Sequence, residues 1–441
     1  MSGPSASTDG ALSDIRVVEF AQALAIPYCG KLLGDMGADV IKVEPPRGDT
    51  YRLQSRSPVK HEGKDFAIAN RGKRSICLDF SKPDAVTVIE ALVRQADAVL
   101  VSMKGSDLPR YGLDYEAIRS YNEQIVFLHN SPYGSQGELA EMGGYDVVAM
   151  GLSGMSSLLA DADDNGAAPV MVRPALADMV TGMLSCLAVV TAIRHRDRTG
   201  EGQRVETSLF HTSLGLLSNM FYRYDAYDRE PMSAFAETLA DIRDAGAGFG
   251  EQKRAMREEF AVDPPGNIYF RHYRTRDGFI SVGCLTPVLN QKLRDVLGLD
   301  DPRREDGFDA EAPEARVALN AFMAEAERIV AKRTTDDWLA TLRAVGVPCA
   351  IVNFPHEIFD DPQARANGYI EDLVHPVHGA YQTVSSPLKM DGTPLRHHGP
   401  SPAMGEHTDD VLRELGFDES TVRSLREADV VGRYDDERNG H

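Results

Sequence analysis

The sequence has few cysteines, and none of them are closely spaced. Its five cysteines are scattered along 441 residues, so the short spacings of zinc sites, iron–sulfur clusters and redox pairs are missing. An odd number of scattered cysteines is also unlike a disulfide framework, and we expect a reduced, cytoplasmic protein. No metal and no tightly bound cofactor are predicted. The five residues are Cys29, Cys77, Cys186, Cys284 and Cys349.

The sequence also lacks an excess of positive charge, a leader segment and a long apolar run. It carries 47 Lys and Arg against 67 Asp and Glu, a formal net charge of −20. This charge opposes binding to nucleic acid and to anionic membrane surfaces. Residues 1–11 have no basic and apolar segments in succession, which predicts a disordered tail and no signal peptide. The longest apolar stretch, 179–193, is shorter than the ~20 residues that span a bilayer and predicts a buried helix.

The clearest pattern that is present is an alternation of short apolar strands with helical segments. Strands are predicted at 15–20, 38–44, 75–80, 97–102 and 125–130. Such alternation is typical of βαβ units and predicts an α/β fold whose large lobe is Rossmann-like, with a mostly parallel sheet. The turn after the first strand carries Ala25, Ile26 and Pro27 where a GxGxxG motif would lie, so it does not predict dinucleotide binding.

Turn-forming residues and charged stretches divide the rest of the chain into predicted parts. Residues 226–262 are charged, contain glycines and show no sustained alternation, which indicates a long connection. The stretch FRHYRTRDGFISVGC predicts a hairpin that turns at Asp277 and Gly278. The predicted parts are a large domain over 12–225, a connection or lid over 226–262, a smaller α+β domain over 263–350, and a C-terminal segment over 351–441 that returns to the large domain.

Asp178 is the most informative polar residue, because it interrupts an apolar segment that begins after Pro174. An aspartate at the start of a helix can cap the free backbone N–H groups. The same position gains about 0.3–1 kcal/mol from the helix macrodipole, which favours an ionised carboxylate that can attack a carbonyl carbon. Composition does not rank the two interpretations.

Several blocks together resemble one known family. They begin with LSDIRVVEFAQALAIPYCGKLLGDMGADVIKVEPPRGD at the N-terminus and continue in the family's order to GEHTDDVLRELG. Between them lie NRGKRSICLDF, LPRYGLDYEAI, GGYDVVAMGLSG, the Asp178 block through TGEGQRVETSL, and DDWLATLRAVGVP. The chain resembles the family III CoA-transferases, a group that includes formyl-CoA and carnitine CoA-transferases and the α-methylacyl-CoA racemases.

The resemblance implies an acyl-CoA:carboxylate CoA-transferase in which Asp178 is the nucleophile. Asp178 would form an anhydride with the acyl group and then a thioester with CoA, which splits one difficult exchange into easier steps. Acyl-CoA and a free carboxylic acid would be the substrates. Glycine-containing backbone near the site would supply N–H donors to each tetrahedral intermediate.

The resemblance also implies CoA contacts along the large domain. Arg110 suits a phosphate because a guanidinium binds phosphate in a bidentate manner, and a solvated surface arginine is its alternative interpretation. The basic cluster near position 72 is either a phosphate contact or a solvated loop. The implied contacts are Leu24, Ala25, Arg47, Arg71, Lys73, Arg74, Leu78, Asp79, Ser102, Met103, Lys104, Arg110, Tyr133, Gly134, Tyr145 and Asp146.

The choice between CoA transfer and racemisation depends on the motif Gly144-Tyr145-Asp146. By the same resemblance, the racemases of this family carry a GHD-like motif, whose histidine serves as an acid or base. The histidine is missing here, and a tyrosine with an ordinary pKa near ~10 is a poor base at neutral pH. CoA transfer is therefore favoured. Asp146 either lines the site or has a capping or turn role.

Two alternatives to transfer between molecules remain open. One is an isomerase, either a racemase or an enzyme that moves CoA within one molecule, and the other is a non-catalytic CoA-binding subunit. Glycines 246, 248 and 250 could cover the intermediate as a lid or could belong to a flexible connection. The resemblance further implies an interlocked homodimer, a property that composition does not show.

Overall fold

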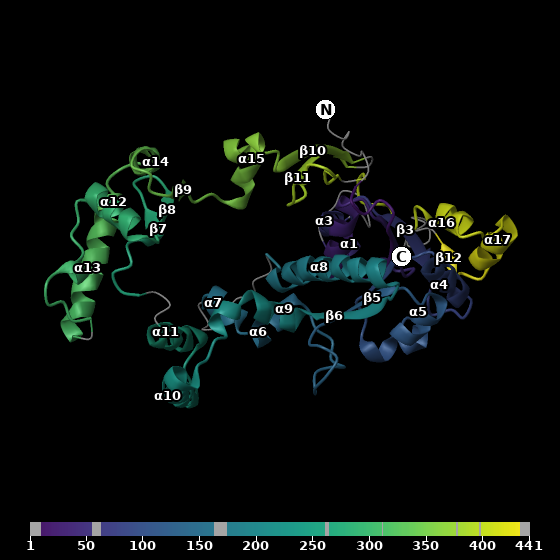
Figure 1. The fold of residues 1–441 in the computed structure, drawn as a ribbon, viewed down its shortest axis with the longest axis horizontal. Helices are drawn as coiled ribbons and strands as arrows, with labels where there is room; N and C mark the ends of the chain where they lie inside the picture. Colours follow the sequence, from purple (N-terminus) through teal and green to yellow (C-terminus); the bar gives the residue numbers. More distant parts are fainter. Residues whose placement is uncertain are drawn as a thin grey trace. The chain divides into compact units, whose positions relative to one another are not determined.

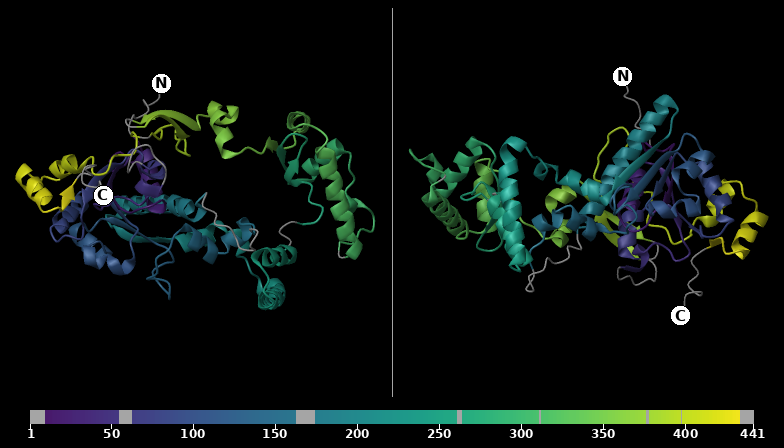
Figure 2. Two further views of the ribbon diagram at one scale, coloured as in Figure 1. Left: turned by 180° about the vertical axis from the view of Figure 1, so that it is seen from behind. Right: turned by 90° about the horizontal axis from the view of Figure 1, so that it is seen from below.

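The fold is described from a computed structural model, which covers residues 10–54, 63–162, 174–260, 264–310, 312–375, 378–396 and 398–432. The chain divides into two compact units. The first unit combines Met1–Arg229 with Gly368–His441, and the second is Glu230–Asn367. Each unit is described by itself below, and Figures 1 and 2 show the elements of both.

A seven-stranded sheet forms the centre of the first unit. Its strand order is β12-β3-β2-β1-β4-β5-β6, and all neighbours are parallel except the antiparallel pair β12 and β3. The predicted α/β class and mostly parallel sheet are confirmed. The strands are β1 (Arg16–Phe20), β2 (Asp39–Glu44), β3 (Arg74–Leu78), β4 (Ala98–Val101), β5 (Val126–Ser131), β6 (Gln203–Ser208) and β12 (Val431–Gly432).

Helices cover both faces of the sheet. Successive strand residues point to opposite faces and therefore pack against different helices. Val17 packs with α1 (Ala25–Asp35) and α8 (Leu176–Thr199), whereas Val18 packs with α4 (Ala85–Arg94) and α5 (Tyr115–Tyr121). Burial on both faces explains why the strands read as almost continuous apolar runs. Figure 1 shows α1 and α8 on the same side of the sheet.

The remaining elements of the first unit surround this sheet. They include a two-stranded antiparallel hairpin that is separate from the main sheet. They are α2 (Tyr51–Gln54), α3 (Lys64–Asn70), η1 (Gly105–Asp107), η2 (Pro109–Tyr111), α6 (Asp146–Leu152), α7 (Met155–Leu159), α9 (Leu209–Leu216), η3 (Ser218–Met220), the hairpin strands β10 (Ile370–His375) and β11 (Gly379–Val384), α16 (Thr408–Glu414) and α17 (Glu419–Glu427).

The second unit has its own core around the buried Trp338. The predicted hairpin at Asp277 is present as β7 and β8, and Asp277 accepts the backbone N–H of Thr335 at 2.8 Å. The antiparallel strands are β7 (Phe270–Arg274), β8 (Phe279–Gly283) and β9 (Cys349–Ile351). The helices are α12 (Pro287–Leu297), η4 (Pro302–Arg304), α13 (Pro313–Val330), α14 (Thr335–Ala344), η5 (Pro355–Asp360) and α15 (Pro362–Ala366).

Two helices occupy most of the segment 226–262, for which the sequence predicts no regular structure. They are α10 (Asp225–Asp244) and α11 (Phe249–Glu259). No residue of α10 is buried, but Met232, Phe235, Leu239 and Ile242 recur at helical spacing, a signal that the sequence analysis overlooked. Gly248 precedes α11 as its N-cap residue.

Helix α8 is the longest apolar helix among the described residues, and by length and composition alone it could cross a membrane. It packs instead along α1 and the sheet, where Cys186, Val189 and Ile193 belong to the core. The buried helix predicted from its apolar stretch is therefore present. Its opposite side exposes Met183 and Leu187.

The contact between α1 and α8 depends on the absence of a side chain at Gly182. A Cβ atom there would lie 2.6 Å from the carbonyl oxygen of Ala25 and 3.0 Å from the Tyr28 ring. We therefore expect Gly182→Ala to lower the free energy of unfolding by about 1–3 kcal/mol, because the two backbones must separate. Urea denaturation followed by circular dichroism measures this change.

The matched control is Gly151→Ala in α6. A Cβ atom at Gly151 would have no atom within 4 Å outside its own helix backbone and chain neighbours. Because alanine favours a helix more than glycine does, this variant should be as stable as the wild type or slightly more stable. Equal stability of the two variants would contradict the close packing of α1 on α8.

Candidate active site

A cavity of about 500 Å³ lies at the carboxyl ends of the strands in the first unit. Its lining includes Ala21 to Ile26 after β1 and Ser102 to Lys104 after β4, at the point where the strand order reverses. Open α/β sheets bind their ligands at such a switch point. The volume falls within the range of about 300–1,000 Å³ that is typical of small-molecule sites.

Three helices point their N-termini at this cavity. Leu24 precedes α1, Asp146 begins α6, and Ala175 precedes α8, and all three residues line the cavity. The first N–H groups of a helix have no partner within the helix and carry partial positive charge. This end of the sheet is therefore suited to hold negative charge.

Asp178 lines the cavity from the third residue of α8. Its side chain makes no capping hydrogen bond, so the capping interpretation of Asp178 is wrong. The cap comes from another helix. Asp146 Oδ1 accepts the backbone N–H of Asp178 at 3.1 Å, and the N–H of Ala177 is also hydrogen-bonded to the Asp146 carboxylate.

Asp146 thus has both of the roles between which the sequence left a choice. It lines the cavity and caps the N-terminus of α8, although it lies 32 residues before Asp178. The carboxylate of one helix fixes the first turn of the helix that carries the other aspartate. The two carboxyl groups are held as neighbours by this arrangement.

The pKa of Asp178 is raised to about 7, first by burial and then by the Asp146 carboxylate. The expectation that the macrodipole keeps Asp178 fully ionised at neutral pH is therefore wrong. The reason is that removing a carboxylate from water costs more than the ~0.3–1 kcal/mol that the dipole returns. Burial also raises the pKa of Asp146, and the backbone N–H groups of Asp178 and Ala177 offset part of that shift.

The cavity lining also contains residues that the sequence did not single out, among them Gln22, Ala23, Tyr51 and Asn130. Gln22 and Ala23 directly follow the first strand, and the rule that ligands lie at strand carboxyl ends would have found them. Burial and the nearby Asp178 carboxylate raise the pKa of Tyr51 to about 12, so its hydroxyl stays protonated. The same rule marks Asn130, which ends the predicted strand 125–130, whereas nothing in the local sequence marks Tyr51.

Comparison with known proteins identifies the family. The model of CoA-transferase family III matches residues 12–408. The chain belongs to the family III CoA-transferases. A succinate–glutarate CoA-transferase of Agrobacterium fabrum is 32% identical over 426 residues, which are 93% of this chain and 97% of that protein. A succinyl-CoA:mesaconate CoA-transferase of Haloarcula hispanica is 28% identical over 433 residues, with 94% of this chain and 98% of that protein covered.

A solved structure agrees with this family membership. The crystal structure of a CaiB/BaiF family protein from Brucella suis matches with a TM-score of 0.70 and 28% identity, and the match covers 92% of this chain and all of that chain. The family predicted from the sequence is confirmed, and with it the enzyme class, an acyl-CoA:carboxylate CoA-transferase.

The structure brings about half of the predicted site residues of this family III enzyme to one cavity. Besides Asp178, the lining contains seven residues predicted as CoA contacts: Leu24, Ala25, Ser102, Met103, Lys104, Tyr145 and Asp146. Lys104 is the one cation among the described residues of the lining. It is exposed, and it lies beside Gly143.

The basic cluster predicted near position 72 does not line the cavity. Lys73 is fully buried, and its ammonium donates to Glu19 at 2.7 Å, the carbonyl of Pro27 at 2.8 Å and Asn70 at 2.9 Å. All three ammonium hydrogens are thereby used, so Lys73 cannot contact a phosphate, and its prediction as a CoA contact is wrong.

The two arginines of that cluster are also engaged in ion pairs within the first unit. Arg71 is buried and pairs with Asp35 at 3.0 Å. Arg74 pairs with Asp39 at 2.6 Å and with Glu414 at 2.8 Å. The sequence showed the density of positive charge, but the acidic partners come from distant segments and were not visible locally.

Two further predicted contacts serve the packing of β3. Leu78 is fully buried in the core, and its backbone pairs with Val431 of β12, so neither its side chain nor this edge is open to a ligand. Its prediction as a CoA contact is therefore wrong. Asp79 accepts the N–H of Ser81 at 3.1 Å and forms a turn after the strand.

The remaining predicted contacts are not among the residues that line the cavity. Arg110 lies over the ring of Tyr111 at 5.5 Å, and Tyr111 stacks edge-on against Phe80, which does line the cavity. Tyr133 donates to the carbonyl of Gly143 at 3.4 Å. The other two, Gly134 and the exposed Arg47, lie in loops whose neighbours in sequence, Pro132 and Pro45, belong to the lining.

The raised pKa of Asp178 predicts a pH-dependent effect on stability. Its pKa is about 7 in the folded chain and about 4 in the unfolded chain, so ionisation destabilises the fold fully above pH 7 and not at all below pH 4. We expect Asp178→Asn to raise the melting temperature by about 2–4 °C or more at pH 8.

The rise in melting temperature of Asp178→Asn should become smaller as the pH falls and should vanish near the ordinary pKa of a carboxyl group. Differential scanning calorimetry at several pH values measures it. Asp107→Asn, which removes an exposed carboxyl group of the same unit, controls for the change in net charge. A stabilisation that does not vary with pH would show that Asp178 has an ordinary pKa.

Proposed function

We propose that the protein moves CoA from an acyl-CoA thioester to a free carboxylic acid through covalent intermediates on Asp178. The observation that carries this proposal is the position of Asp178 in the cavity, with a pKa near 7 that burial and Asp146 produce. A carboxylate with this pKa is ionised in about half of the molecules at neutral pH and is more basic than an ordinary aspartate. A more basic carboxylate is a better nucleophile.

The reaction proceeds in four balanced steps. The Asp178 carboxylate attacks the thioester carbonyl, the C–S bond breaks, and a mixed anhydride and CoA thiolate result. The thiolate attacks the Asp178 acyl carbon and releases the donor carboxylate, which leaves an aspartyl-CoA thioester. The acceptor carboxylate attacks this thioester, its C–S bond breaks, and a second anhydride and CoA thiolate result. The thiolate then attacks the acceptor acyl carbon and releases the Asp178 carboxylate. The new acyl-CoA leaves, and Asp178 is again a carboxylate.

The backbone around Asp178 supports the charged intermediates of this scheme. Gly143 and Gly144 line the cavity, and the N-terminus of α1 opens onto it, whereas Asp146 already binds the N–H groups of Ala177 and Asp178 at the start of α8. Positioned N–H donors stabilise the oxyanion of each tetrahedral intermediate. Lys104 at the cavity supplies positive charge for the phosphates of CoA.

The names of relatives suggest which acids to test first. The relatives from Agrobacterium fabrum and Haloarcula hispanica are named for succinate, glutarate and mesaconate, all of which are dicarboxylic acids. We infer that small dicarboxylates are the first donors and acceptors to test. A panel of donor thioesters crossed with these acids identifies the pair that this chain prefers.

Mass spectrometry of the trapped intermediate tests the proposal. Enzyme that has been incubated with acyl-CoA and then treated with hydroxylamine should carry a hydroxamate on Asp178, since the anhydride and the thioester both react with this nucleophile. Borohydride should reduce the same position. Asp178→Ala should lose at least ~10⁴-fold in exchange rate, as expected for loss of a covalent nucleophile. An unlabelled Asp178, together with an active alanine variant, would refute the mechanism.

The second candidate function is an isomerase, and one observation favours it. Asp146 and Asp178 form a pair of neighbouring carboxyl groups, and proton transfer at both faces of a substrate requires two acid or base groups. No histidine is found among the described residues of the cavity lining, which argues against racemisation. Incubation in deuterated water separates the two, because racemisation must introduce deuterium at the α-carbon and transfer need not.

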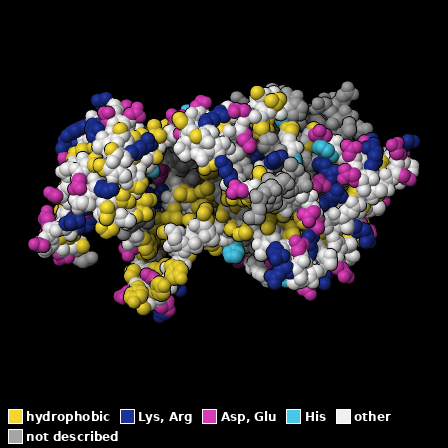
Figure 3. All heavy atoms as spheres, turned by 45° about the horizontal axis from the view of Figure 1, so that its top comes forward, with side chains coloured by type: hydrophobic (Ala, Val, Ile, Leu, Met, Phe, Trp, Pro, Cys, Tyr) yellow, Lys and Arg dark blue, Asp and Glu magenta, His cyan; other side chains and the backbone are white. Residues whose placement is uncertain are grey.

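A homodimer is also proposed for this protein, in agreement with the sequence resemblance. Large apolar side chains are exposed in groups on the first unit, and Figure 3 shows such groups on the face that it presents. Exposed patches of this kind mark interaction surfaces. The exposed apolar residues in the first half of α8 and around the start of α10 are Met183, Leu184, Leu187, Met220, Phe221, Tyr222, Tyr224 and Tyr227.

Light scattering coupled to size exclusion should therefore give twice the mass of one 48.3 kDa chain. Leu187→Asp, which places a charge where the side chain is 62% exposed, should weaken the dimer. Glu201→Lys, at an exposed charged position just beyond the end of the same helix, should leave the mass unchanged. A wild-type protein that elutes as a monomer would contradict the dimer.

A further inference from the structure

A row of polar and charged side chains lies inside the sheet of the first unit, on the face that α1 covers. Glu19 of β1 is in register with Lys42 of β2, and Lys42 is in register with Ser75 of β3. All three side chains are fully buried. The Lys42 ammonium lies 3.1 Å from Glu19 Oε1 and 2.9 Å from Asp49 Oδ2.

Burial of these charges is costly, so their presence requires a physical reason. Burial acts to lower the pKa of Lys42, but the carboxylates of Asp49, Glu19 and Glu44 outweigh it and raise that pKa above its ordinary value. The ammonium therefore stays charged. Buried ion pairs can often be replaced by apolar residues without loss of stability, and their known benefit is to specify one conformation.

The network holds the backbone of the cavity wall in place. The Lys42 ammonium donates to the carbonyl of Ala21 at 2.8 Å. Asp49 Oδ1 accepts the N–H of Ala23 at 3.1 Å and the N–H of Tyr51 at 2.9 Å. Ala21, Ala23 and Tyr51 all line the cavity that contains Asp178. One ion pair thus clamps the chain on both sides of Gln22.

Ala23 adopts a conformation that the clamp must enforce. Its φ is +65°, in the left-handed region that residues other than glycine rarely occupy. Such a residue persists only where its surroundings hold it, and strained residues cluster at functional sites. The hydrogen bond from Ala23 to Asp49 is the described contact that fixes its N–H.

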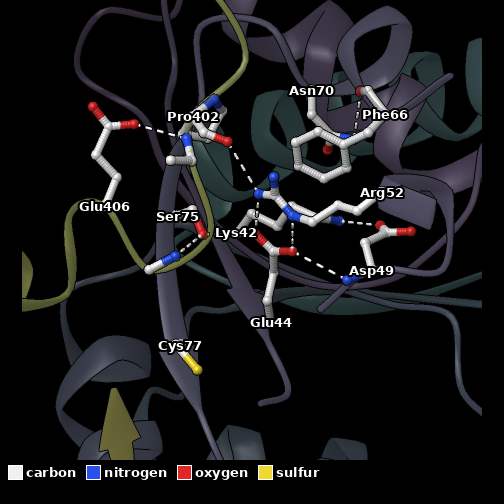
Figure 4. Close-up of polar contacts among 12 residues, drawn as sticks. Lys42, Glu44, Asp49, Arg52, Phe66, Asn70, Ser75, Cys77, Pro402 and Glu406 are labelled. Carbon is white, nitrogen blue, oxygen red and sulfur yellow. Dashed lines mark hydrogen bonds and ion pairs between the residues drawn. The ribbon is translucent and has the colours of Figure 1, made fainter. Parts of the chain in front are cut away.

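Asp49 is itself held in place by Glu44, as Figure 4 shows. Its N–H donates to Glu44 Oε2 at 3.2 Å, and Glu44 binds the guanidinium of Arg52 through two bonds of 2.7 Å. Arg52 also donates to the carbonyl of Pro402 at 3.0 Å. The carboxylate that clamps the cavity wall is therefore attached to a second buried ion pair and to the C-terminal segment.

We propose that Asp49 is a positioning residue that holds the cavity wall at Ala23 and Tyr51 in the geometry that receives CoA. It acts through these two N–H groups and through Lys42, and it does not line the cavity. The inference rests on the proposed function, because it assigns CoA to this cavity.

The first test is hydrogen exchange of the full chain without any ligand. If Asp49 positions the wall in advance, the amides of Ala23 and Tyr51 must be protected to the level of β1. Rapid exchange at these two amides would overturn the proposal, because the wall would then form only around the ligand. This test needs no variant that has to fold.

The second test measures CoA binding by calorimetry. Asp49→Asn keeps the size of the side chain. If the amide oxygen accepted the N–H groups of Ala23 and Tyr51, however, the amide NH2 group would face the Lys42 ammonium and be repelled by it. It should weaken CoA binding about tenfold. Adding Ala23→Gly should recover at least about threefold, because glycine adopts a positive φ without strain. A purely structural role of Asp49 predicts no recovery.

Asp301→Asn is the matched control. Asp301 is a buried carboxylate of the second unit that accepts the N–H of Arg303 at 3.1 Å and the hydroxyl of Tyr269 at 2.6 Å. This variant should bind CoA as the wild type does. Equal loss of binding in both variants would show general destabilisation and would overturn the proposal.

The outcomes separate this inference from the proposed function. A wild-type chain that binds no CoA would refute the function. A folded Asp49→Asn variant that binds CoA as tightly as the wild type would refute the positioning role and leave the function standing. If Asp49→Asn does not fold, the exchange measurement decides.

Discussion

The buried ammonium of Lys42 is the point on which the architecture of the site depends. It joins Glu19 on β1, Asp49 after β2 and the carbonyl of Ala21. Gly30 lets α1 approach this layer, because a Cβ atom there would lie 2.1 Å from Glu19 Oε2. The charges therefore fix the positions of two strands, the first helix and the loop between them. A purely apolar layer would pack as well but would have no directional bonds with which to hold that loop.

A second polar contact, between Asp146 and the first turn of α8, determines the environment of Asp178. The residue that caps its helix is not a local serine or threonine but the carboxylate of Asp146. Capping by a second acid orients the first turn of α8 and raises the pKa of Asp178 by repulsion, in addition to burial. One contact thus supplies both geometry and reactivity. The fold places the two acids together by bringing the N-termini of α6 and α8 to the end of one sheet.

Much of the fold could be predicted from local patterns. The strand predicted at 38–44 corresponds to β2, and the strand predicted at 125–130 corresponds to β5, each within one residue of the expected ends. Two elements with a short or charge-interrupted pattern were missed. Strand β12 is two residues long and produces no periodic signal, whereas the apolar positions of α10, such as Phe235 and Leu239, stand among charged residues and were overlooked. The site was predicted where motif and strand ends coincide, as at Leu24 and Ser102, and failed at Lys73, whose partner Glu19 lies 54 residues away.

The sequence by itself determined the family, the α/β class and the position of the candidate nucleophile, because these follow from motif order and hydrophobic periodicity. The tertiary structure alone decided which charges are available. Lys73 is engaged in a buried ion pair, Lys104 is exposed at the cavity, and burial and Asp146 raise the pKa of Asp178 to about 7. Burial and the distance to other charges set the state of each group, and both arise only when segments far apart in the chain come together.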